Sequence, residues 1–466
     1  MNRTVLILGG GLAGITAALR LSAQGYHIAV VDSAPRLGGR LVALSQDSAS
    51  ATSIDIRRLE PPLVADIPLV LFGCHTATWS LLELLGTAEE VRCQPSCVLE
   101  FLLTDGRRAR LSAGRLPAPF HIVRLLLGFR GLLWKDRWRL FNFLERTWEN
   151  RISLPSDLES RTAAEWLAEI GQSSLACENV WGPLARLLLG DGITHLSASM
   201  LTGTLCRHYL TRPGHATVSV PSSPIQTLML DPAHQQMTRA GVKLQLGATV
   251  TQLRFNHERV TGVQLQDGST LTADWYIVAL PYDRLQPLLP ERIVTRYATF
   301  EHLGHLRSVP GLAMQVRVNA SVQTPRVIML ANRTFHWVVV RPASSLGVRE
   351  PLVTLMCVGE GERLAQSDEQ ILLDARRDLT VADASLGNAT RGEWHILRSP
   401  NAFLSMEPGS RPYRPLQQTP FENLLLAGDW TETGWPANVE SAVVSGTRCA
   451  AIIAESAAAI AASLPG

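Results

Sequence analysis

The feature that most constrains the fold lies at the N-terminus, where a short apolar segment runs into a cluster of glycines. Residues 4–8 read TVLIL, and residues 9–14 follow with GGGLAG. Aliphatic and β-branched residues without polar alternation are typical of a parallel strand buried on both faces. A helix-forming stretch covers residues 15–23, and a second apolar stretch, residues 27–31, ends at Asp32. The order strand, glycine turn, helix, strand and acid predicts a βαβ unit that binds a dinucleotide.

Each residue of the glycine turn has a physical task in this interpretation. Gly9 permits a tight turn, Gly11 lets a pyrophosphate approach the backbone, and Gly14 allows the helix to pack closely on the strand. Leu12 and Ala13 of the turn are also expected to bind the cofactor, and the N-terminus of the helix that follows offers N–H groups and a partial positive charge to phosphate oxygens. The alternative is a glycine-rich turn without a ligand.

The residues that follow the acid discriminate between two classes of dinucleotide. Asp32 is expected to accept hydrogen bonds from a ribose diol. Residues 32–40 read DSAPRLGGR, an extension for which nicotinamide enzymes have no need. It resembles the acid-x(5)-GGR segment of the FAD-dependent amine oxidase and phytoene desaturase superfamily, in which Glu usually replaces the Asp. The resemblance places Gly38, Gly39 and Arg40 beside the diphosphate and ribityl chain of FAD.

The C-terminal region carries the second part of the resemblance. Residues 424–451 read LLLAGDWTETGWPANVESAVVSGTRCAA. In the superfamily a strand ends in AGD, whose Asp binds a ribityl hydroxyl, and the first amides of a proline-started helix face the flavin. The resemblance assigns the first role to Gly428 and Asp429 and the second to Pro436 and Val439. The helix dipole would stabilise negative charge on the reduced flavin ring.

A third part of the resemblance lies in mid-chain. Residues 244–250 read LQLGATV, and residues 260–269 form a predicted hairpin with an Asp-Gly turn. In the superfamily the valine at the position of Val250 meets the adenine through its backbone. The resemblance therefore implies an α/β protein with a discontinuous Rossmann-type FAD-binding domain and an inserted α+β substrate domain. The expected FAD-binding domain comprises residues 1–60, 222–285 and 412–466, and the substrate domain comprises residues 61–221 and 286–411.

The tail resembles one branch of the superfamily in particular, the bacterial hydroxysqualene dehydroxylases, which share the order GDWT-x-TG-x-PA. Residues 180–189, VWGPLARLLL, and 221–233, PSSPIQTLMLDPA, are similar to further segments of that branch. The branch usually carries a polar DNGQH-like run, whereas the matching residues 65–69 read ADIPL. Asp66 is the one acid left in this run. Asp66 and His75 are the candidate catalytic residues, and a structural role is the alternative for each.

The resemblance implies an enzyme of squalene and hopanoid biosynthesis that reduces hydroxysqualene to squalene by hydride transfer from reduced FAD. Its partners would be a long-chain isoprenoid substrate and an electron donor for the flavin. Two alternatives stay open. One is a carotenoid or phytoene-type desaturase, which runs hydride transfer in the opposite direction. The other is an inactive flavin-binding scaffold, which the loss of the polar run at residues 65–69 suggests. An amine oxidase is disfavoured, since no cysteine lies in a flavin-linking context.

Residues 115–151 combine eight basic and three acidic side chains with Trp134, Trp138 and Trp148. A helix with an apolar face, aromatic residues and flanking basic residues can lie in a membrane interface. The alternative is a pair of amphipathic helices packed on the substrate domain, with solvated arginines. Because the expected substrate dissolves in lipid, we favour contact with a membrane surface. The expected location is peripheral, on the inner face of the cytoplasmic membrane.

Composition excludes several further classes of protein and of binding partner. The chain has 466 residues, of which 46 % are hydrophobic and 18 % charged, which suits a globular protein with a large core. A net charge of +2 and the lack of a binding module argue against a nucleic-acid partner. Seven scattered cysteines without CxxC, and twelve histidines without HxH or HExxH, predict reduced thiols, no metal site and a cytoplasmic protein. No run of eighteen apolar residues occurs, so no spanning helix is expected.

Overall fold

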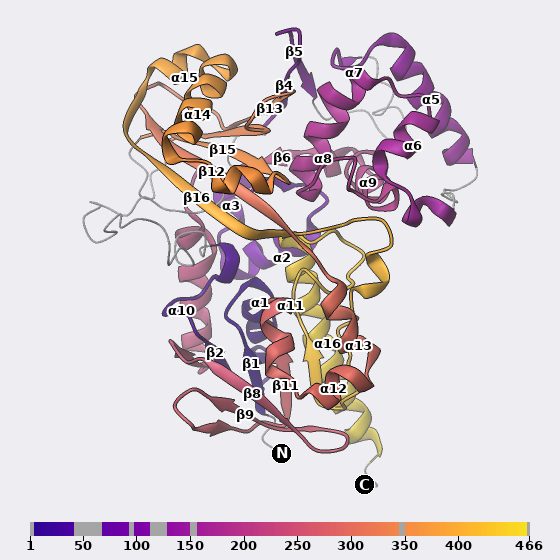
Figure 1. Cartoon of the computed structure of the whole chain (residues 1–466). Coiled ribbons are helices and arrows are strands. Elements are labelled where there is room, and N and C mark those ends of the chain that lie inside the picture. Colours follow the sequence, from indigo (N-terminus) through magenta and orange to yellow (C-terminus); the bar gives the residue numbers. More distant parts are fainter. Residues whose placement is uncertain are drawn as a thin grey trace.

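Three distant parts of the chain meet in one five-stranded parallel sheet at the lower end of the molecule (Figure 1). The computed structural model describes residues 4–41, 68–92, 97–111, 128–149, 156–343 and 350–463. The N-terminal unit is the predicted strand, helix and strand, β1 (Thr4–Leu8), α1 (Leu12–Ser22) and β2 (His27–Asp32). The sheet has the order β17 (Leu424–Leu426), β11 (Trp275–Val278), β1, β2 and β7 (Lys243–Leu246).

This parallel sheet explains why the chain termini must fold together. Strand β1 pairs with β2 on one side and with β11 on the other, and β11 pairs with β17. The long C-terminal helix α16 (Val439–Ser463) then packs against α1. A Cβ atom at Gly446 of α16 would lie 2.2 Å from the carbonyl oxygen of Ala13, so the two helices approach more closely than a larger residue permits. The small residues of the tail serve this packing.

A second, larger sheet of seven strands lies in the upper half of the molecule, beside helices such as α5 and α8 (Figure 1). Its strands are antiparallel except for the parallel pair of β13 and β4. Its order is β16 (Thr390–Leu404), β12 (Ser308–Val318), β15 (Leu352–Val358), β14 (Trp337–Arg341), β13 (Arg326–Leu330), β4 (Leu99–Leu102) and β5 (Arg108–Leu111). A mixed α/β fold with a Rossmann-type parallel sheet is confirmed, while the predicted domain boundaries stay predictions.

Smaller sheets and helices complete the fold. The remaining strands are β8 (Val250–Phe255), β9 (Val260–Leu265) and β10 (Thr270–Leu271) in one antiparallel sheet, and β3 (Leu71–Phe72) with β6 (Val218–Ser219) in another. The remaining α-helices are α2 (Thr76–Leu85), α3 (Ala88–Arg92), α5 (Trp134–Glu149), α6 (Ala163–Glu169), α7 (Ser174–Ala176), α8 (Gly182–Leu189), α9 (Ala198–Leu205), α10 (Asp231–Arg239), α11 (Tyr282–Leu285), α12 (Glu291–Arg296), α13 (Ala298–Glu301), α14 (Asp368–Ala382) and α15 (Ala384–Asn388). Among the described residues, none of these helices has the length and apolar character needed to cross a membrane.

In the part of the chain that the structure describes, the buried apolar residues form three clusters that follow this layout. One lies under the parallel sheet with α1 and α16, and one lies between the large sheet and α14. The third continues from the ends of the parallel strands into helices α8 and α9. This third cluster joins the two halves of the molecule, so it borders the segment that carries the expected flavin residues.

Candidate functional site

The glycine turn has the shape that a bound diphosphate requires. Gly9 has a left-handed backbone with φ of +109°, and a Cβ atom there would lie 2.6 Å from the carbonyl oxygen of Ala279. A Cβ atom at Gly14 would lie only 2.0 Å from the carbonyl oxygen of Gly9. At Gly11 the situation differs, because the nearest atom to a Cβ would be the Cα of Gly39 at 4.0 Å. The protein does not need glycine at this position for its own packing, so the open space is available to a ligand.

The start of α1 faces this space with its backbone. Gly11 precedes the helix in an extended conformation, and no side chain caps it. No acidic residue lies in the first turn. The side chains of Leu12 and Ala13 are buried, so these residues meet a ligand through their amides. Unpaired amides and the positive helix end favour an anion here.

Asp32 holds the turn and offers further acceptor sites. One oxygen of its carboxylate accepts a hydrogen bond from the amide of Gly10 at 2.6 Å, and the other accepts from the amide of Ala34 at 2.8 Å. An ionised carboxylate has about four acceptor sites, so acceptors remain for a ribose diol. The amide of Ala248 donates to the carbonyl oxygen of Asp32, which brings the segment before Val250 to the same place. The expected adenine contact of Val250 fits this position.

The segment after Asp32 crosses over the glycine turn and reaches the C-terminal part of the chain. The amide of Gly38 donates to the carbonyl oxygen of Gly10 at 2.9 Å, and Gly38 and Gly39 both have left-handed backbones. The guanidinium of Arg40 pairs with the carboxylate of Asp429, which is 389 residues away in the chain. The predicted N-terminal and C-terminal flavin residues are therefore adjacent.

The loop between β17 and α16, residues 427–438, is fixed by contacts within the protein, and because it carries predicted flavin residues it is called the flavin loop below. The amide of Gly428 donates to the hydroxyl of Ser445 at 3.0 Å, and a Cβ atom at Gly428 would lie 2.4 Å from the indole nitrogen of Trp430. Helix α16 starts at Val439, so the prediction that Pro436 opens the helix is wrong by three residues. The reason is that the side chain of Asn438 accepts from the amide of Ser441 at 2.9 Å and caps the helix itself. Val439 still supplies one of the first amides.

Of the two candidate catalytic residues, Asp66 and His75, the structure describes His75. Asp66 lies outside the described residues. His75 is buried at the start of α2, where its Nδ1 accepts from the amide of Phe72 at 3.3 Å. His208 is also buried, and its Nδ1 donates to the carbonyl oxygen of Thr204 at 2.7 Å. The two imidazole rings have centroids 5.6 Å apart, and both present an edge-to-face contact to Trp435 in the flavin loop.

The hydrogen bonds at Nδ1 fix the roles of the opposite ring nitrogens. The Nε2 of His75 carries the proton and the Nε2 of His208 carries a lone pair, and neither atom has a hydrogen-bond partner among the described residues. Burial, assisted by the nearby His208, lowers the pKa of His75 to about 3. Burial likewise lowers the pKa of His208 to about 4. Both rings are neutral at pH 7, and together they present one donor and one acceptor.

Among the described residues, two clusters have the residue types of a metal site. Ligand atoms of Cys74, His75 and His208 lie within 4.8 Å of one another. The amide at the Nδ1 of His75 leaves a proton, not a lone pair, on Nε2, and burial raises the pKa of the Cys74 thiol to about 12, so the donor set is poor for a metal. In the second cluster, His336 uses both ring nitrogens in hydrogen bonds, to Glu360 and from the amide of Val358. That the chain has no metal stays a prediction.

The sequence model of the flavin containing amine oxidoreductase family matches residues 12–454. The chain belongs to this family. It is an FAD-dependent oxidoreductase, and the open glycine turn, Asp32 and the Arg40–Asp429 pair fit that cofactor.

Relatives of this amine oxidoreductase family member include two carotenoid desaturases. The 15-cis-phytoene desaturase of an Oncidium hybrid cultivar is 24 % identical over 97 % of this chain and 78 % of its own length. The zeta-carotene desaturase of Synechocystis is 22 % identical, with 96 % of each chain covered. Among solved structures, an oxidoreductase from Methanosarcina mazei has a TM-score of 0.70 at 15 % identity, covering 96 % of this chain and 99 % of its own. Putrescine oxidase bound to putrescine has a TM-score of 0.70 at 16 % identity, covering 98 % and 99 %. These two structures share the fold.

Arg414 is a residue of the site that had no signal in the sequence. The side chain of Arg414 is 1 % exposed, and its guanidinium donates to the carbonyl oxygens of Asp429 at 2.8 Å, Thr431 at 2.7 Å and Trp435 at 2.8 Å. Burial lowers the pKa of this guanidinium, which nevertheless stays charged. Arg414 thus fixes the flavin loop of this oxidoreductase through three of the loop's carbonyl groups. Arg414 lies in the segment RPYRPL, residues 411–416, where no spacing or periodicity indicates its hydrogen-bond partners.

Proposed function

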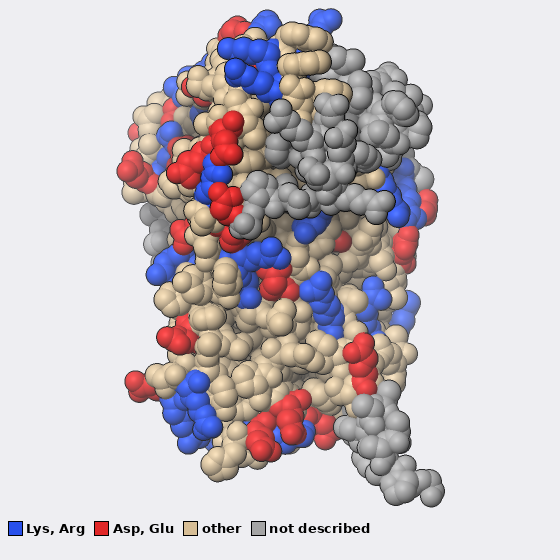
Figure 2. Space-filling view, turned by 90° about the vertical axis from the view of Figure 1, so that its right-hand side faces the viewer, with Lys and Arg blue, Asp and Glu red and all other residues tan. Residues whose placement is uncertain are grey.

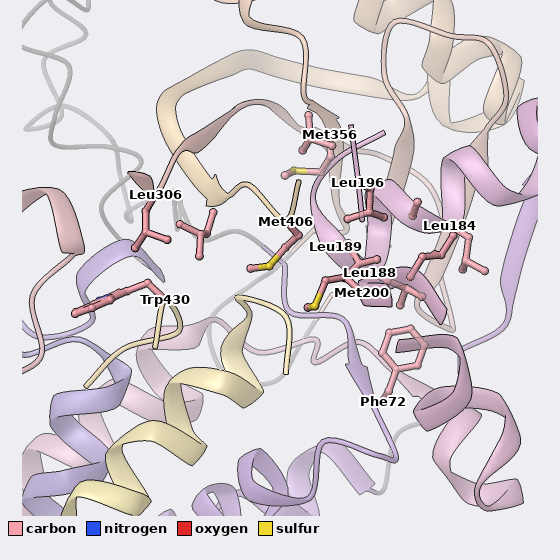
Figure 3. Packing of buried hydrophobic residues seen from close by; sticks show 14 of the residues in the cluster. Phe72, Leu184, Leu188, Leu189, Leu196, Met200, Leu306, Met356, Met406 and Trp430 are labelled. Carbon is pink, nitrogen blue, oxygen red and sulfur yellow. The ribbon is translucent and has the colours of Figure 1, made fainter. Parts of the chain in front are cut away.

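We propose that this oxidoreductase transfers a hydride between FAD and a long-chain isoprenoid, and that the reaction is the reduction of hydroxysqualene to squalene. The observation that carries the proposal is the apolar surrounding of the flavin loop. Trp430, Met406 and Leu306 lie close together above the start of α16, and the band of buried side chains continues to Met200 and Phe72 (Figure 3). A hydrocarbon chain bound against this band would contact mainly carbon and sulfur atoms, which favours a hydrocarbon over a small amine as the substrate.

The choice of an alcohol as substrate is supported by the His75 and His208 pair. A hydroxyl group both donates and accepts one hydrogen bond, and the two Nε2 atoms offer the matching acceptor and donor. A pure hydrocarbon has no group that could form a hydrogen bond with either imidazole. The tail order shared with hydroxysqualene dehydroxylases, which begins at Gly428 and includes Pro436, supports the same choice.

The reaction consumes one hydride and one proton, exchanges a C–O bond for a C–H bond and releases water. Bound FAD, in its reduced FADH2 form, would supply both the hydride and the proton and would be left as oxidised FAD. The chain's residues orient the substrate and keep bulk water away from the carbon that loses its hydroxyl. Since His75 is neutral at pH 7, its Nε2–H polarises the C–O bond by a hydrogen bond and does not act as a cationic acid. His208 accepts from the same hydroxyl.

A carotenoid or phytoene-type desaturase is the second candidate, because the relatives of this chain include phytoene and zeta-carotene desaturases. That reaction removes two hydrogens from a hydrocarbon and reduces the flavin. It needs the same FAD site and the same apolar surroundings, but it gives the paired imidazoles no substrate group to bind. The two candidates therefore differ in the direction of hydride transfer and in the need for His75 and His208.

One experiment separates these candidates. The FAD-loaded protein is reduced anaerobically and mixed with hydroxysqualene, and in parallel the oxidised protein is mixed with phytoene and a quinone acceptor. We expect squalene and reoxidised flavin in the first mixture, and a His208→Gln variant should form squalene at least tenfold more slowly. A coloured product from phytoene without squalene would favour the desaturase. An unchanged flavin spectrum in both mixtures would favour the third alternative, an inactive flavin-binding scaffold.

A further inference from the structure

One turn of the flavin loop, residues 432–435, reaches the surface of the protein. The side chain of Glu432 is 20 % exposed, and Gly434 and Trp435 are half-buried. The carboxylate of Glu432 accepts from the amide of Gly434 at 2.7 Å, which closes the turn. A molecule in solution can therefore touch the loop that carries predicted flavin residues.

Two exposed arginines contact this turn. The Nε of Arg411 donates to the carboxylate of Glu432 at 3.3 Å. The guanidinium of Arg448 donates to the carbonyl oxygen of Glu432 at 3.0 Å and to that of Thr433 at 2.9 Å. Both arginines are exposed to solvent. Because the partners of Arg448 are neutral carbonyl groups, these contacts fix its side chain and leave its charge in place.

A third arginine, Arg207, reaches the turn from η6 (Cys206–Leu210), a π-helical segment that continues α9. Its Cζ lies 5.0 Å from the centroid of the Trp435 ring. Its Nη2 lies 3.8 Å from the position that a Cβ atom of Gly434 would take. Burial lowers the pKa of Arg207, and the nearby Arg411 lowers it further, so two like charges lie close together here. Arginine stays charged despite such shifts.

Acidic side chains do not balance these charges. Among the described residues, Glu432 is the one carboxylate within 4.0 Å of the three arginines or of the buried Arg414. Burial raises the pKa of Asp191, and Glu407 raises it further, so the carboxylate of Glu407 lies toward the end of α8. Figure 2 shows the side of the molecule on which α13 and α16 lie in Figure 1, with Lys and Arg side chains across the middle of this face. The turn thus carries a net positive charge.

An exposed apolar side chain lies beside the same turn. Leu416 is 62 % exposed. The carbonyl oxygen of Pro415 accepts from the amide of Glu432 at 2.8 Å, and the carbonyl oxygen of Gln417 accepts from the amide of Leu426 at 2.8 Å. The backbone on both sides of Leu416 is therefore held in place. An exposed apolar side chain among arginines has the composition of a protein-binding surface.

We propose that a small acidic electron-transfer protein docks here and reduces the bound FAD. The docking site is called the donor surface, and it consists of the turn 432–435 with Arg207, Arg411, Arg448 and Leu416. The inference rests on the proposed function, in which each turnover consumes FADH2 that must be regenerated. Two molecules of a reduced one-electron carrier each give one electron, two protons come from the solvent, and FAD becomes FADH2.

The flavin loop connects the donor surface to the cofactor. Asp429 of this loop and Val439, the residue just after it, are predicted flavin residues, so the carrier and FAD would contact the same short segment. Attraction between the arginines and an acidic face of the carrier would orient it and speed its encounter, and this attraction weakens as salt is added. A small donor such as NADPH or a quinol would gain little from an exposed leucine, which favours a protein as the donor.

The test is anaerobic stopped-flow reduction of the FAD-loaded full chain by a reduced plant-type 2Fe–2S ferredoxin, an acidic one-electron carrier. No isoprenoid is added, and the loss of oxidised flavin absorbance gives the second-order rate constant. We expect this rate constant to fall at least tenfold from low to high salt. At low salt, the double variant Arg411→Glu/Arg448→Glu should lower it at least tenfold, and Leu416→Ala should lower it at least threefold.

Matched controls separate docking from net charge and from loss of FAD. Arg239→Glu/Arg292→Glu makes the same change in net charge at exposed positions of α10 and α12. Leu373→Ala removes a side chain of α14 that is 61 % exposed. Both controls should be reduced by ferredoxin at the wild-type rate. Photoreduction with 5-deazariboflavin, which is neutral, should proceed equally in all variants if each binds FAD.

Each outcome supports or overturns the inference. A rate constant that does not depend on salt, or one that falls equally in the control variants, would overturn it. Fast reduction by NADPH or a quinol together with no reduction by ferredoxin would assign the flavin to a small donor and would also overturn it. A failure of the proposed reaction shows separately, as photoreduced protein that forms no squalene from hydroxysqualene while its reduction by ferredoxin still depends on Arg411 and Arg448.

Discussion

At the residue scale, two glycines of the same turn serve different partners. Gly14 is required by the protein, since its missing Cβ makes room for the carbonyl oxygen of Gly9. Gly11 is required by the ligand, since a Cβ there would enter space that no described protein atom occupies closely. The GxGxxG pattern reveals both glycines but does not distinguish these roles.

This difference can be measured by flavin content and by stability. Gly11→Val should lower the FAD content at least tenfold and leave the stability of the FAD-free protein almost unchanged. Gly14→Ala should destabilise the FAD-free protein by about 1–3 kcal/mol, because the new methyl group overlaps with backbone. Flavin absorbance per chain and urea unfolding of the FAD-free variants give the two quantities. Equal loss of stability in both variants would contradict the assignment.

Arg414 supports a second prediction at this scale. Arg414→Met removes a charged donor and leaves several carbonyl groups of the flavin loop without their partner. We expect a loss of roughly 2–4 kcal/mol in the free energy of unfolding, together with weaker FAD binding. Arg411→Met is the matched control, since Arg411 is exposed and its guanidinium pairs with the carboxylate of Glu432 at 3.3 Å. Similar losses in the two variants would show that loop carbonyls do not depend on Arg414.

The buried imidazoles predict how stability depends on pH. Their pKa values are about 3 for His75 and about 4 for His208 in the folded protein, against an ordinary value of 6.5. Between these limits the unfolded chain binds protons that the folded protein does not, so stability falls as the pH is lowered from 6.5 toward 4. The expected slope is about 1.4 kcal/mol per pH unit for each ring. Urea unfolding at pH 7, 6 and 5 should therefore show a flatter dependence in the double variant His75→Gln/His208→Gln than in His257→Gln, whose side chain is exposed.

At the element scale, the start of α16 joins the flavin loop to α2. The carboxylate of Glu440 is 1 % exposed and accepts from the amides of Ala77 and Thr78 and from the hydroxyl of Thr78, at 2.7 to 2.9 Å. It thereby caps α2, whose first residue follows His75. The first turn of α16 thus positions both the amide of Val439 and the imidazole of His75.

Glu440→Ala should release the first turn of α2. The loss of three hydrogen bonds to a buried carboxylate would cost about 2–3 kcal/mol in the free energy of unfolding. Hydrogen exchange would locate the effect, with faster exchange at the amides of Ala77 and Thr78 than at the middle of α1. Glu455→Ala, at an exposed position of the same helix, is the control. Unchanged exchange at the start of α2 would exclude the capping role.

Local patterns predicted the elements of the flavin site better than their contacts. The turn from Gly9 to Gly14, the acid Asp32 and the AGD segment could be found because each depends on neighbours in sequence. The contacts of Arg414, Glu440 and His208 could not, because their partners lie far away in the chain or on another element. The predicted start of α16 is wrong for a related reason. A proline is permitted at the start of a helix but does not fix it, whereas the cap formed by the side chain of Asn438 sets the first helical residue.

At the scale of the whole molecule, FAD would contact three separate parts of one sheet. Strands β1 and β2, the turn before β8 and the loop after β17 come from distant parts of the chain. Among the described residues, the pair of Arg40 and Asp429 already links the first part to the last. A ligand that spans all three adds its binding free energy to the stability of the folded protein. The free energy of unfolding is therefore expected to rise when the cofactor binds.

This linkage gives the last prediction. At a free FAD concentration one hundred times its Kd, the free energy of unfolding should rise by about 2.7 kcal/mol over the FAD-free protein, with a corresponding rise in Tm. The rise should grow with the logarithm of the FAD concentration, because the ligand binds only the folded state. NAD should give no rise at the same concentrations, since the segment from Gly38 to Arg40 is specific to the flavin nucleotide in this interpretation. Gly11→Val should abolish the response to FAD. A Tm that rises equally with NAD, or one that ignores FAD, would contradict the cofactor assignment made from the glycine turn.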